Sequence, residues 1–192
     1  MTWWKVHGER SLHESDTVRL GLADVELTDG TRIDHYVIRI PFEVVSLVLS
    51  DAAGRLLLIW RYRFITNQWL WDVPAGKVAP GEAPADAAAR ASVEETGWRP
   101  GPVRLLGEYH PSPGLSDKRF GVYVANGAER VGEPSVNEVE RLEWVTVARV
   151  RELIRDGQVD GLSLTSLLWA LDAGETPGVD VADVITSHPP EA

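Results

Sequence analysis

Residues 76–98 have the pattern of a loop, one helix and a helix stop. This stretch constrains the possible fold of the chain more than any other. Pro84 suits the first helical position, where its missing N–H costs nothing. Residues 85–91 are rich in alanine, the strongest helix former. Gly97 suits the left-handed conformation that follows many helix ends. The sequence therefore predicts a helix over residues 84–96.

One face of this predicted helix ends in two neighbouring carboxylates. Positions spaced i, i+4, i+7 and i+8 share a side of a helix, and here they are Ala87, Ala91, Glu94 and Glu95. In the simplest interpretation this is a solvated acidic end, with Arg90 pairing with Glu94. However, the helix macrodipole opposes negative charge at a C-terminus. A hard divalent cation would compensate that charge, so a metal site is the second interpretation.

The composition is ordinary for a soluble globular protein of 192 residues, with 44% hydrophobic and 25% charged residues. The chain has no apolar run of about 20 residues, no signal-like N-terminus and no cysteine, so we expect a cytoplasmic protein without a membrane span. A formal charge of −10 disfavours nucleic-acid binding. It also repels phosphate-bearing substrates at long range, so such a substrate must be held locally by metal and arginine.

Alternating segments and apolar runs predict a mixed sheet with helices on its faces, which is an α/β (α+β) class. The expected strands are 17–27, 33–40, 42–49, 55–62, 103–110, 119–125 and 142–145. We expect strand 55–62 to be buried on both faces. Helices are expected at 147–156 and at 162–171, and Ser163 or Thr165 is expected to start the second one. Residues 127–140 are expected to form a mobile polar loop. The expected division is an N-terminal antiparallel sheet over 1–40, a main domain over 41–171 and a loosely ordered tail over 172–192.

The spacing in residues 76–98 resembles the signature of the Nudix hydrolase family. That signature is Gly, five residues, Glu, seven residues, then Arg-Glu-apolar-any-Glu-Glu-any-Gly-apolar. The positions that match in register are Gly76, Glu82, Arg90, Glu94, Glu95, Gly97 and Trp98. The resemblance implies a helix–sheet–helix sandwich. One departure is serious, because Ala91 stands where the family carries a metal-binding glutamate.

Other segments resemble the ADP-ribose pyrophosphatase branch of that family. Residues 71–76 (Trp-Asp-Val-Pro-Ala-Gly) are similar to Trp-Glu-Leu-Pro-Ala-Gly of the branch, and residues 111–117 to its Pro-Ser-Pro-Gly-Phe-Ser-Asp loop. The branch implies a small nucleotide substrate, and the charge and the lack of a long apolar run argue against nucleic acid and membrane as partners. It also implies a homodimer formed through residues 1–40.

The resemblance implies roles for individual residues. Mg²⁺ (or Mn²⁺) would be bound by Glu94, Glu95, Glu82 and the Ala75 carbonyl. Arg90 would organise the loop by pairing with Glu82, and a plain pair with Glu94 stays open as its alternative role. The catalytic base would come from the late polar loop, where Glu138 is the first candidate and Glu140 the second. Contacts to the substrate are expected from Arg61, Arg63, Trp71 and Ser116.

The expected reaction is hydrolysis of a nucleoside diphosphate derivative, such as ADP-ribose or a nucleotide sugar, by metal-assisted attack of water on the pyrophosphate. Ala91 leaves three interpretations open. It is a substitution introduced into an active hydrolase, or a natural site that works with fewer ligands. In the third interpretation the protein is a non-catalytic Nudix module that binds a nucleotide or a partner.

Overall fold

The computed structural model describes residues 3–134 and 139–174, and the chain folds as two compact units. The first unit holds the chain up to Val44 together with Glu108–Phe120. The second holds Val45–Gly107 and the described residues from Gly121 to Gly174. The segment 108–120 thus belongs with the N-terminal region, whereas the expected division of the chain placed it in the main domain.

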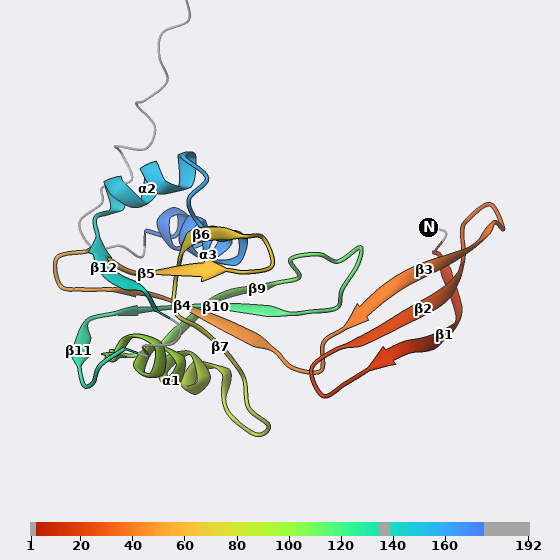
Figure 1. Cartoon of the computed structure of the whole chain (residues 1–192), viewed down its shortest axis with the longest axis horizontal. Coiled ribbons are helices and arrows are strands. Elements are labelled where there is room, and N and C mark those ends of the chain that lie inside the picture. Colours follow the sequence, from red (N-terminus) through yellow and green to blue (C-terminus); the bar gives the residue numbers. More distant parts are fainter. Residues whose placement is uncertain (1–2, 135–138, 175–192) are drawn as a thin grey trace, which may run out of the picture. The chain divides into compact units, whose positions relative to one another are not determined.

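The first unit contains a three-stranded antiparallel sheet in the order β1-β2-β3 (Figure 1). The strands are β1 (Lys5–Glu14), β2 (Arg19–Glu26) and β3 (Arg32–Arg39). The turn before β3 contains Gly30 at φ 86°, and Asp29 accepts a hydrogen bond from the Thr31 N–H at 2.9 Å. The predicted N-terminal antiparallel sheet is therefore confirmed. Strand β1 was not predicted, because its side chains are mostly polar and exposed.

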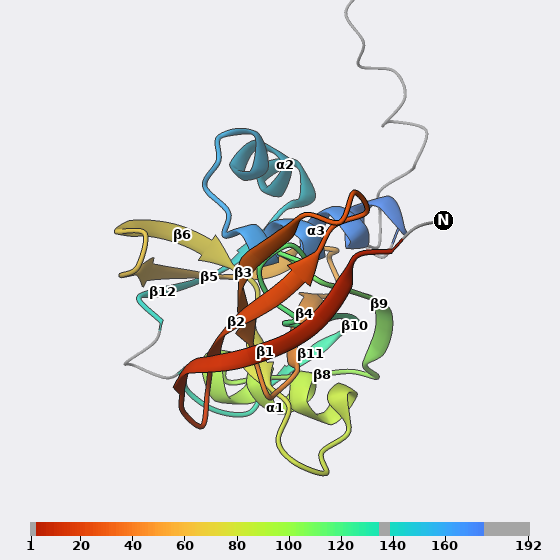
Figure 2. The same cartoon turned by 90° about the vertical axis from the view of Figure 1, so that its right-hand side faces the viewer.

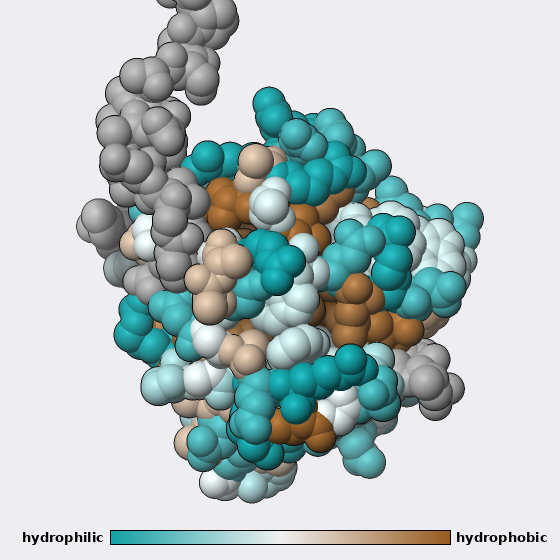
Figure 3. All heavy atoms as spheres, turned by 90° about the vertical axis from the view of Figure 1, so that its left-hand side faces the viewer, coloured by the Kyte–Doolittle hydropathy of each residue, from teal (hydrophilic) through white to brown (hydrophobic). Residues whose placement is uncertain are grey.

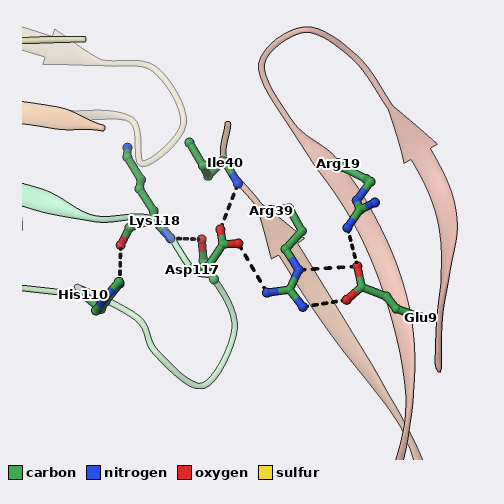
Figure 4. Close-up of polar contacts among 8 residues, drawn as sticks. Glu9, Arg19, Arg39, Ile40, His110, Asp117 and Lys118 are labelled. Atoms are coloured by element: carbon green, nitrogen blue, oxygen red, sulfur yellow. Dashed lines mark hydrogen bonds and ion pairs between the residues drawn. The ribbon is translucent and has the colours of Figure 1, made fainter. Parts of the chain in front are cut away.

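An ion-pair network connects the strands of this unit with the loop that carries Asp117 (Figure 4). Glu9 accepts from Arg19 at 3.1 Å and from Arg39 at 2.6 Å, which lowers the pKa of Glu9. Arg39 also contacts Asp117 at 3.3 Å, and Asp117 accepts from the Ile40 N–H at 3.0 Å. These contacts give a physical reason for the segment 108–120 to associate with the N-terminal sheet.

The second unit is built on a seven-stranded sheet with the path β12-β5-β4-β10-β9, on which β6 pairs with β5 and β7 with β4. Its strands are β4 (Val44–Ser50), β5 (Leu56–Arg63), β6 (Gln68–Asp72), β7 (Ala75–Lys77), β9 (Arg104–Tyr109), β10 (Phe120–Asn126) and β12 (Arg141–Val145). A separate pair joins β8 (Trp98–Pro100) to β11 (Ala128–Arg130). The region 127–140, predicted to be a loop, thus contains a short strand.

Helices cover both faces of this sheet: α1 (Pro84–Thr96) lies on one side, α2 (Val147–Arg155) and α3 (Gly161–Asp172) on the other (Figures 1 and 2). A core cluster that includes Leu47, Leu57 and Ala88 packs under α1. A second cluster, which includes Leu58 and Leu153, packs under α2 and α3. The helix–sheet–helix arrangement and the α/β (α+β) class are confirmed. No helix within the described ranges is long and apolar enough to cross a membrane.

The helix boundaries follow from local capping. Helix α1 has the predicted bounds, and Gly97 ends it at φ 74° with its N–H donating to the Val93 carbonyl. Helix α3 begins at Gly161 because the Asp160 side chain caps it, so the predicted start at Ser163 or Thr165 was wrong. Strand β5 is fully buried only over its first four residues, and the prediction of burial along its whole length was also wrong.

The buried start of β5 leads into a hairpin with exposed aromatic side chains. Trp60 stacks on Trp69 with ring centroids 6.1 Å apart, and Tyr62 lies 5.5 Å from Trp69. Exposed Phe64 and Ile65 stand between the two strands. Figure 3 shows one face of the molecule, where hydrophobic atoms gather in separate patches between polar side chains.

Candidate active site

The C-terminal half of α1 and strand β7 line a pocket of about 340 Å³. Its lining residues are Ala75, Gly76, Lys77, Arg90, Ala91, Glu94 and Glu95. Residues near the start of the stretch 76–98 and residues near its end therefore line the same cavity.

Arg90 connects the loop before α1 to the helix itself. Its guanidinium bonds both oxygens of Glu82, at 2.8 and 2.9 Å, and donates to Glu94 at 2.9 Å and to the Lys77 carbonyl at 2.9 Å. Glu82 also accepts from the Ala79 N–H at 2.9 Å. The hydrogen bonds from Arg90 lower the pKa of Glu82 to about 2, and those from Glu82 raise the pKa of Arg90. In this structure Arg90 makes both of the contacts that the sequence analysis treated as alternatives.

The two adjacent glutamates at the end of α1 have different surroundings. The Glu95 residue is 8% exposed, and its oxygens accept from Arg61 Nη1 and from the Ala75 N–H, both at 3.0 Å. The side chain of Glu94 is 59% exposed and bonds only to Arg90 among the contacts described. Glu95 is thus a fixed, buried carboxylate, whereas Glu94 can meet a ligand from solvent.

A second buried carboxylate, Asp72, lies behind Arg61 and was not predicted as a site residue. Asp72 is 1% exposed and lies 3.3 Å from Arg61 Nε, in direct contact with Arg63. Burial raises the pKa of Asp72 to about 7, against the opposing effect of the two arginines. The alternation of β5 and β6 could have indicated this cluster, because Arg61, Arg63 and Asp72 fall on one face of that hairpin.

Ala91 lies where strand β7 closely approaches helix α1. Ala91 is 2% exposed, and a Cβ built on Gly76 would lie 2.8 Å from the Ala91 Cβ. Gly76 is therefore required for the close approach of β7 to α1. Because Ala91 lines the pocket, a longer side chain at this position has space to extend into.

The remaining predicted site residues are placed differently. Trp71 is 4% exposed and packs in the cluster under α2 and α3, so its predicted contact with the substrate stays a prediction. Ser116 belongs to the first unit, where it accepts from the Lys118 N–H at 3.1 Å. Glu138 lies outside the described residues. Glu140 is exposed, and its N–H donates to the Trp60 carbonyl, next to Arg61 in β5.

The oxygen atoms of the pocket are of the type that binds a hard divalent cation, but they are few. Glu94, Glu95 and the Ala75 carbonyl supply oxygen, which Mg²⁺ and Mn²⁺ prefer. Within residues 3–134 and 139–174, no group of three Asp, Glu, His or Cys residues could hold an ion. Both oxygens of Glu95 already accept hydrogen bonds. The residues therefore fit a cation with two carboxylates, where the family signature offers three.

Comparisons with known proteins agree with this fold. The NUDIX domain profile matches residues 41–164. A hydrolase of Streptomyces rubellomurinus, named CMP-5'-(N-acetyl-N-hydroxy-3-aminopropyl)phosphonate hydrolase, is 36% identical over 91% of this chain and 87% of its own length. The ADP-ribose pyrophosphatase of Mycobacterium tuberculosis is 28% identical over 82% of this chain and 78% of its own. A crystal structure of an ADP compounds hydrolase has a TM-score of 0.81 at 18% identity, covering 91% of this chain and 96% of that one.

The chain belongs to the Nudix family, since the profile spans most of its length. Within the family it is a Nudix hydrolase of the ADP-ribose pyrophosphatase-like type, which agrees with the resemblance seen in residues 71–76 and 111–117.

Proposed function

We propose that this protein hydrolyses a phosphoric anhydride that joins a nucleoside monophosphate to a second phosphoryl group. ADP-ribose or a related nucleotide sugar is the first candidate substrate. The name of the relative from Mycobacterium tuberculosis supports it. The name of the more similar relative from Streptomyces rubellomurinus supports a second candidate, in which CMP is joined to a phosphonate. Both substrates carry a nucleoside 5'-phosphate in a P–O–P linkage.

In the reaction, the oxygen of water forms a bond to one phosphorus and the bond from that phosphorus to the bridging oxygen breaks. The bridging oxygen leaves with the other phosphoryl group, and a carboxylate base accepts one proton of the water. Glu138 is the first candidate for that base. Glu140 is the second, and its backbone bond to Trp60 at 3.1 Å supports a position next to β5.

The observation that carries this proposal is the convergence of carboxylates and a guanidinium at the end of α1. Glu95 bonds Arg61 at 3.0 Å, and Glu94 lies beside it on the same pocket. Glu94, Glu95 and the Ala75 carbonyl would hold a divalent cation, and that ion would supply positive charge against the phosphate oxygens. Arg61 and Arg63 would bind the diphosphate through charge-assisted hydrogen bonds. Arg90 positions Glu94 and the turn.

Position 91 supports an alternative, a non-catalytic module that binds a nucleotide. An alanine there removes the carboxylate one turn before Glu95, and Arg61 already neutralises Glu95. A site of this kind would keep its arginines for phosphate binding and lose the ion that assists attack by water. Both functions therefore predict binding of the ligand, but only the hydrolase predicts turnover.

The deciding experiment compares the protein with its Ala91→Glu variant on a panel of ADP-ribose, nucleotide sugars and a CMP–phosphonate anhydride. With Mg²⁺ or Mn²⁺ we expect release of the nucleoside monophosphate, and a rise in kcat/KM of at least about tenfold in Ala91→Glu. Glu94→Gln in the Ala91→Glu background is the matched control and should remove the gain. Ligand-dependent thermal stabilisation without product in both proteins would favour the binding module. Neither product nor stabilisation from any panel member would refute both functions.

We also propose a cytoplasmic homodimer. Exposed aromatic residues in the first unit, Trp3, Trp4 and Tyr36, support a role of that sheet in association. Light scattering at micromolar concentration tests the assembly, and a monomer would exclude it. The complete lack of cysteine supports the location.

A further inference from the structure

Asp72 is the most deeply buried carboxylate near the pocket, and it contacts both arginines of β5. It ends β6, opposite Ile59 of β5, and is 1% exposed. Arg61 Nε lies 3.3 Å from Asp72 Oδ2, and Arg63 Nη2 bonds the same oxygen. One carboxylate oxygen therefore holds two guanidinium groups side by side.

The cluster continues from Asp72 to the helix that carries the signature glutamates. Arg61 reaches Glu95 at 3.0 Å, and Glu95 accepts from the Ala75 N–H at 3.0 Å. The β5–β6 hairpin is thus connected through Arg61 to the end of α1, and through Glu95 to the first residue of β7. Asp72 does not itself line the pocket, and its side-chain contacts toward the end of α1 run through Arg61.

Packing alone gives no reason for a charged group at this position. Asp72 Oδ1 and Arg63 Nε are buried without a hydrogen-bond partner within the part of the chain that the structure describes. Burying an incompletely paired charge costs free energy, and a hydrophobic side chain would avoid that cost. The carboxylate accordingly has a role that an apolar residue cannot fill, which is to orient the arginines.

We propose that Asp72 is a positioning residue, which fixes Arg61 and Arg63 in the geometry that binds the diphosphate of the substrate. This inference rests on the proposed function for the identity of the ligand. Asp72 itself touches no substrate. Arg61, with its side chain only 13% exposed, is locked between Asp72 and Glu95, whereas Arg63 keeps 39% of its side chain exposed and is the more accessible of the two.

The test measures arginine position and substrate kinetics in the Asp72→Asn variant, which keeps the size of the side chain and replaces its carboxyl group with a neutral amide. We expect the ¹⁵Nε–H signals of Arg61 and Arg63, assigned through Arg→Lys variants, to shift toward those of exposed arginines. We expect KM to rise at least about tenfold, whereas kcat should stay within about threefold of the value of the unmodified protein. The reason is that the contact of the arginines with the diphosphate is made equally in the bound substrate and in the transition state. The longer carboxylate of Asp72→Glu should restore most of the lost affinity.

A matched control separates positioning from general destabilisation. Ser166→Ala removes a buried hydrogen bond of 2.9 Å to Ser46, in the layer under α3, and should leave both arginine signals and KM unchanged. Arginine signals that do not move in Asp72→Asn, or signals that move while KM stays constant, would overturn the positioning role. If no panel substrate is turned over or bound by the unmodified protein, the proposed function fails, and the arginine signals alone decide whether Asp72 holds the two side chains.

Discussion

Replacing Gly97 with alanine should destabilise the protein through two separate effects at the end of α1. Gly97 has φ 74°, and an alanine in this left-handed conformation costs about 1–2 kcal/mol. The new Cβ would also fall well inside van der Waals contact of the Gly132 carbonyl oxygen, and such overpacking costs about 1–3 kcal/mol. The oxygen belongs to the backbone, and hydrogen bonds from the Val131 and Gly132 N–H groups to the Gly97 carbonyl keep this segment beside the end of α1, so relief of the contact requires a backbone shift.

The expected loss for Gly97→Ala is therefore about 2–5 kcal/mol, measured as the free energy of unfolding in urea. Gly157→Ala is the matched control, because Gly157 has φ 67° and open space around its missing Cβ. This control should lose only the conformational part, about 1–2 kcal/mol. Equal losses in the two variants would refute the steric part of the reasoning, namely the close approach of residue 132 to the end of α1.

Three further predictions concern Gly76, which lines the pocket, and two carboxyl groups outside it, Glu82 and Asp72. Gly76→Ala should destabilise the folded protein by about 1–3 kcal/mol, because the new Cβ meets the Ala91 methyl group. Ala91→Gly removes that methyl group and should recover part of the loss, which a double-mutant cycle of urea unfolding measures. The pKa of Glu82 is lowered to about 2 by Arg90, so its stabilising contribution is complete above pH 4.5 and is lost as the pH falls toward 2; Glu82→Gln should weaken this acid dependence in unfolding experiments between pH 5 and 2. The pKa of Asp72 is instead raised to about 7, so its contribution is complete below pH 3.8 and is lost as the pH rises through 7, and Asp72→Asn should reduce the decline measured between pH 4 and 8.

Helix α1 could be predicted because its signals are local. Pro84, the alanine-rich run and Gly97 act within the helix or directly beside it, and the observed bounds are those predicted. The contact between Arg90 and Glu82 was expected from the resemblance to the Nudix signature, and the structure contains it. The start of α3 was missed because Asp160 competes with Ser163 as a cap, and Ser163 instead accepts the Val73 N–H in the buried layer.

Strand β1 and the membership of segment 108–120 in the first unit could not be predicted from periodicity. A polar strand with both faces exposed has no alternation to detect, and β1 is specified by pairing with β2. Segment 108–120 is joined to the N-terminal sheet by the pair between Arg39 and Asp117, which are 78 residues apart in the chain. Contacts of that separation leave no mark on local sequence patterns.

The sequence by itself determined the family, the helix that carries Glu94 and Glu95, and the absence of a third carboxylate at position 91. Only the tertiary structure decided which groups neutralise these acids. Arg61 meets Glu95 across a separation of 34 residues, and Asp72 holds Arg61 and Arg63 from the neighbouring strand. The physical reason is that strand alternation tells which face a side chain occupies, whereas the partner on that face is set by strand pairing and helix packing.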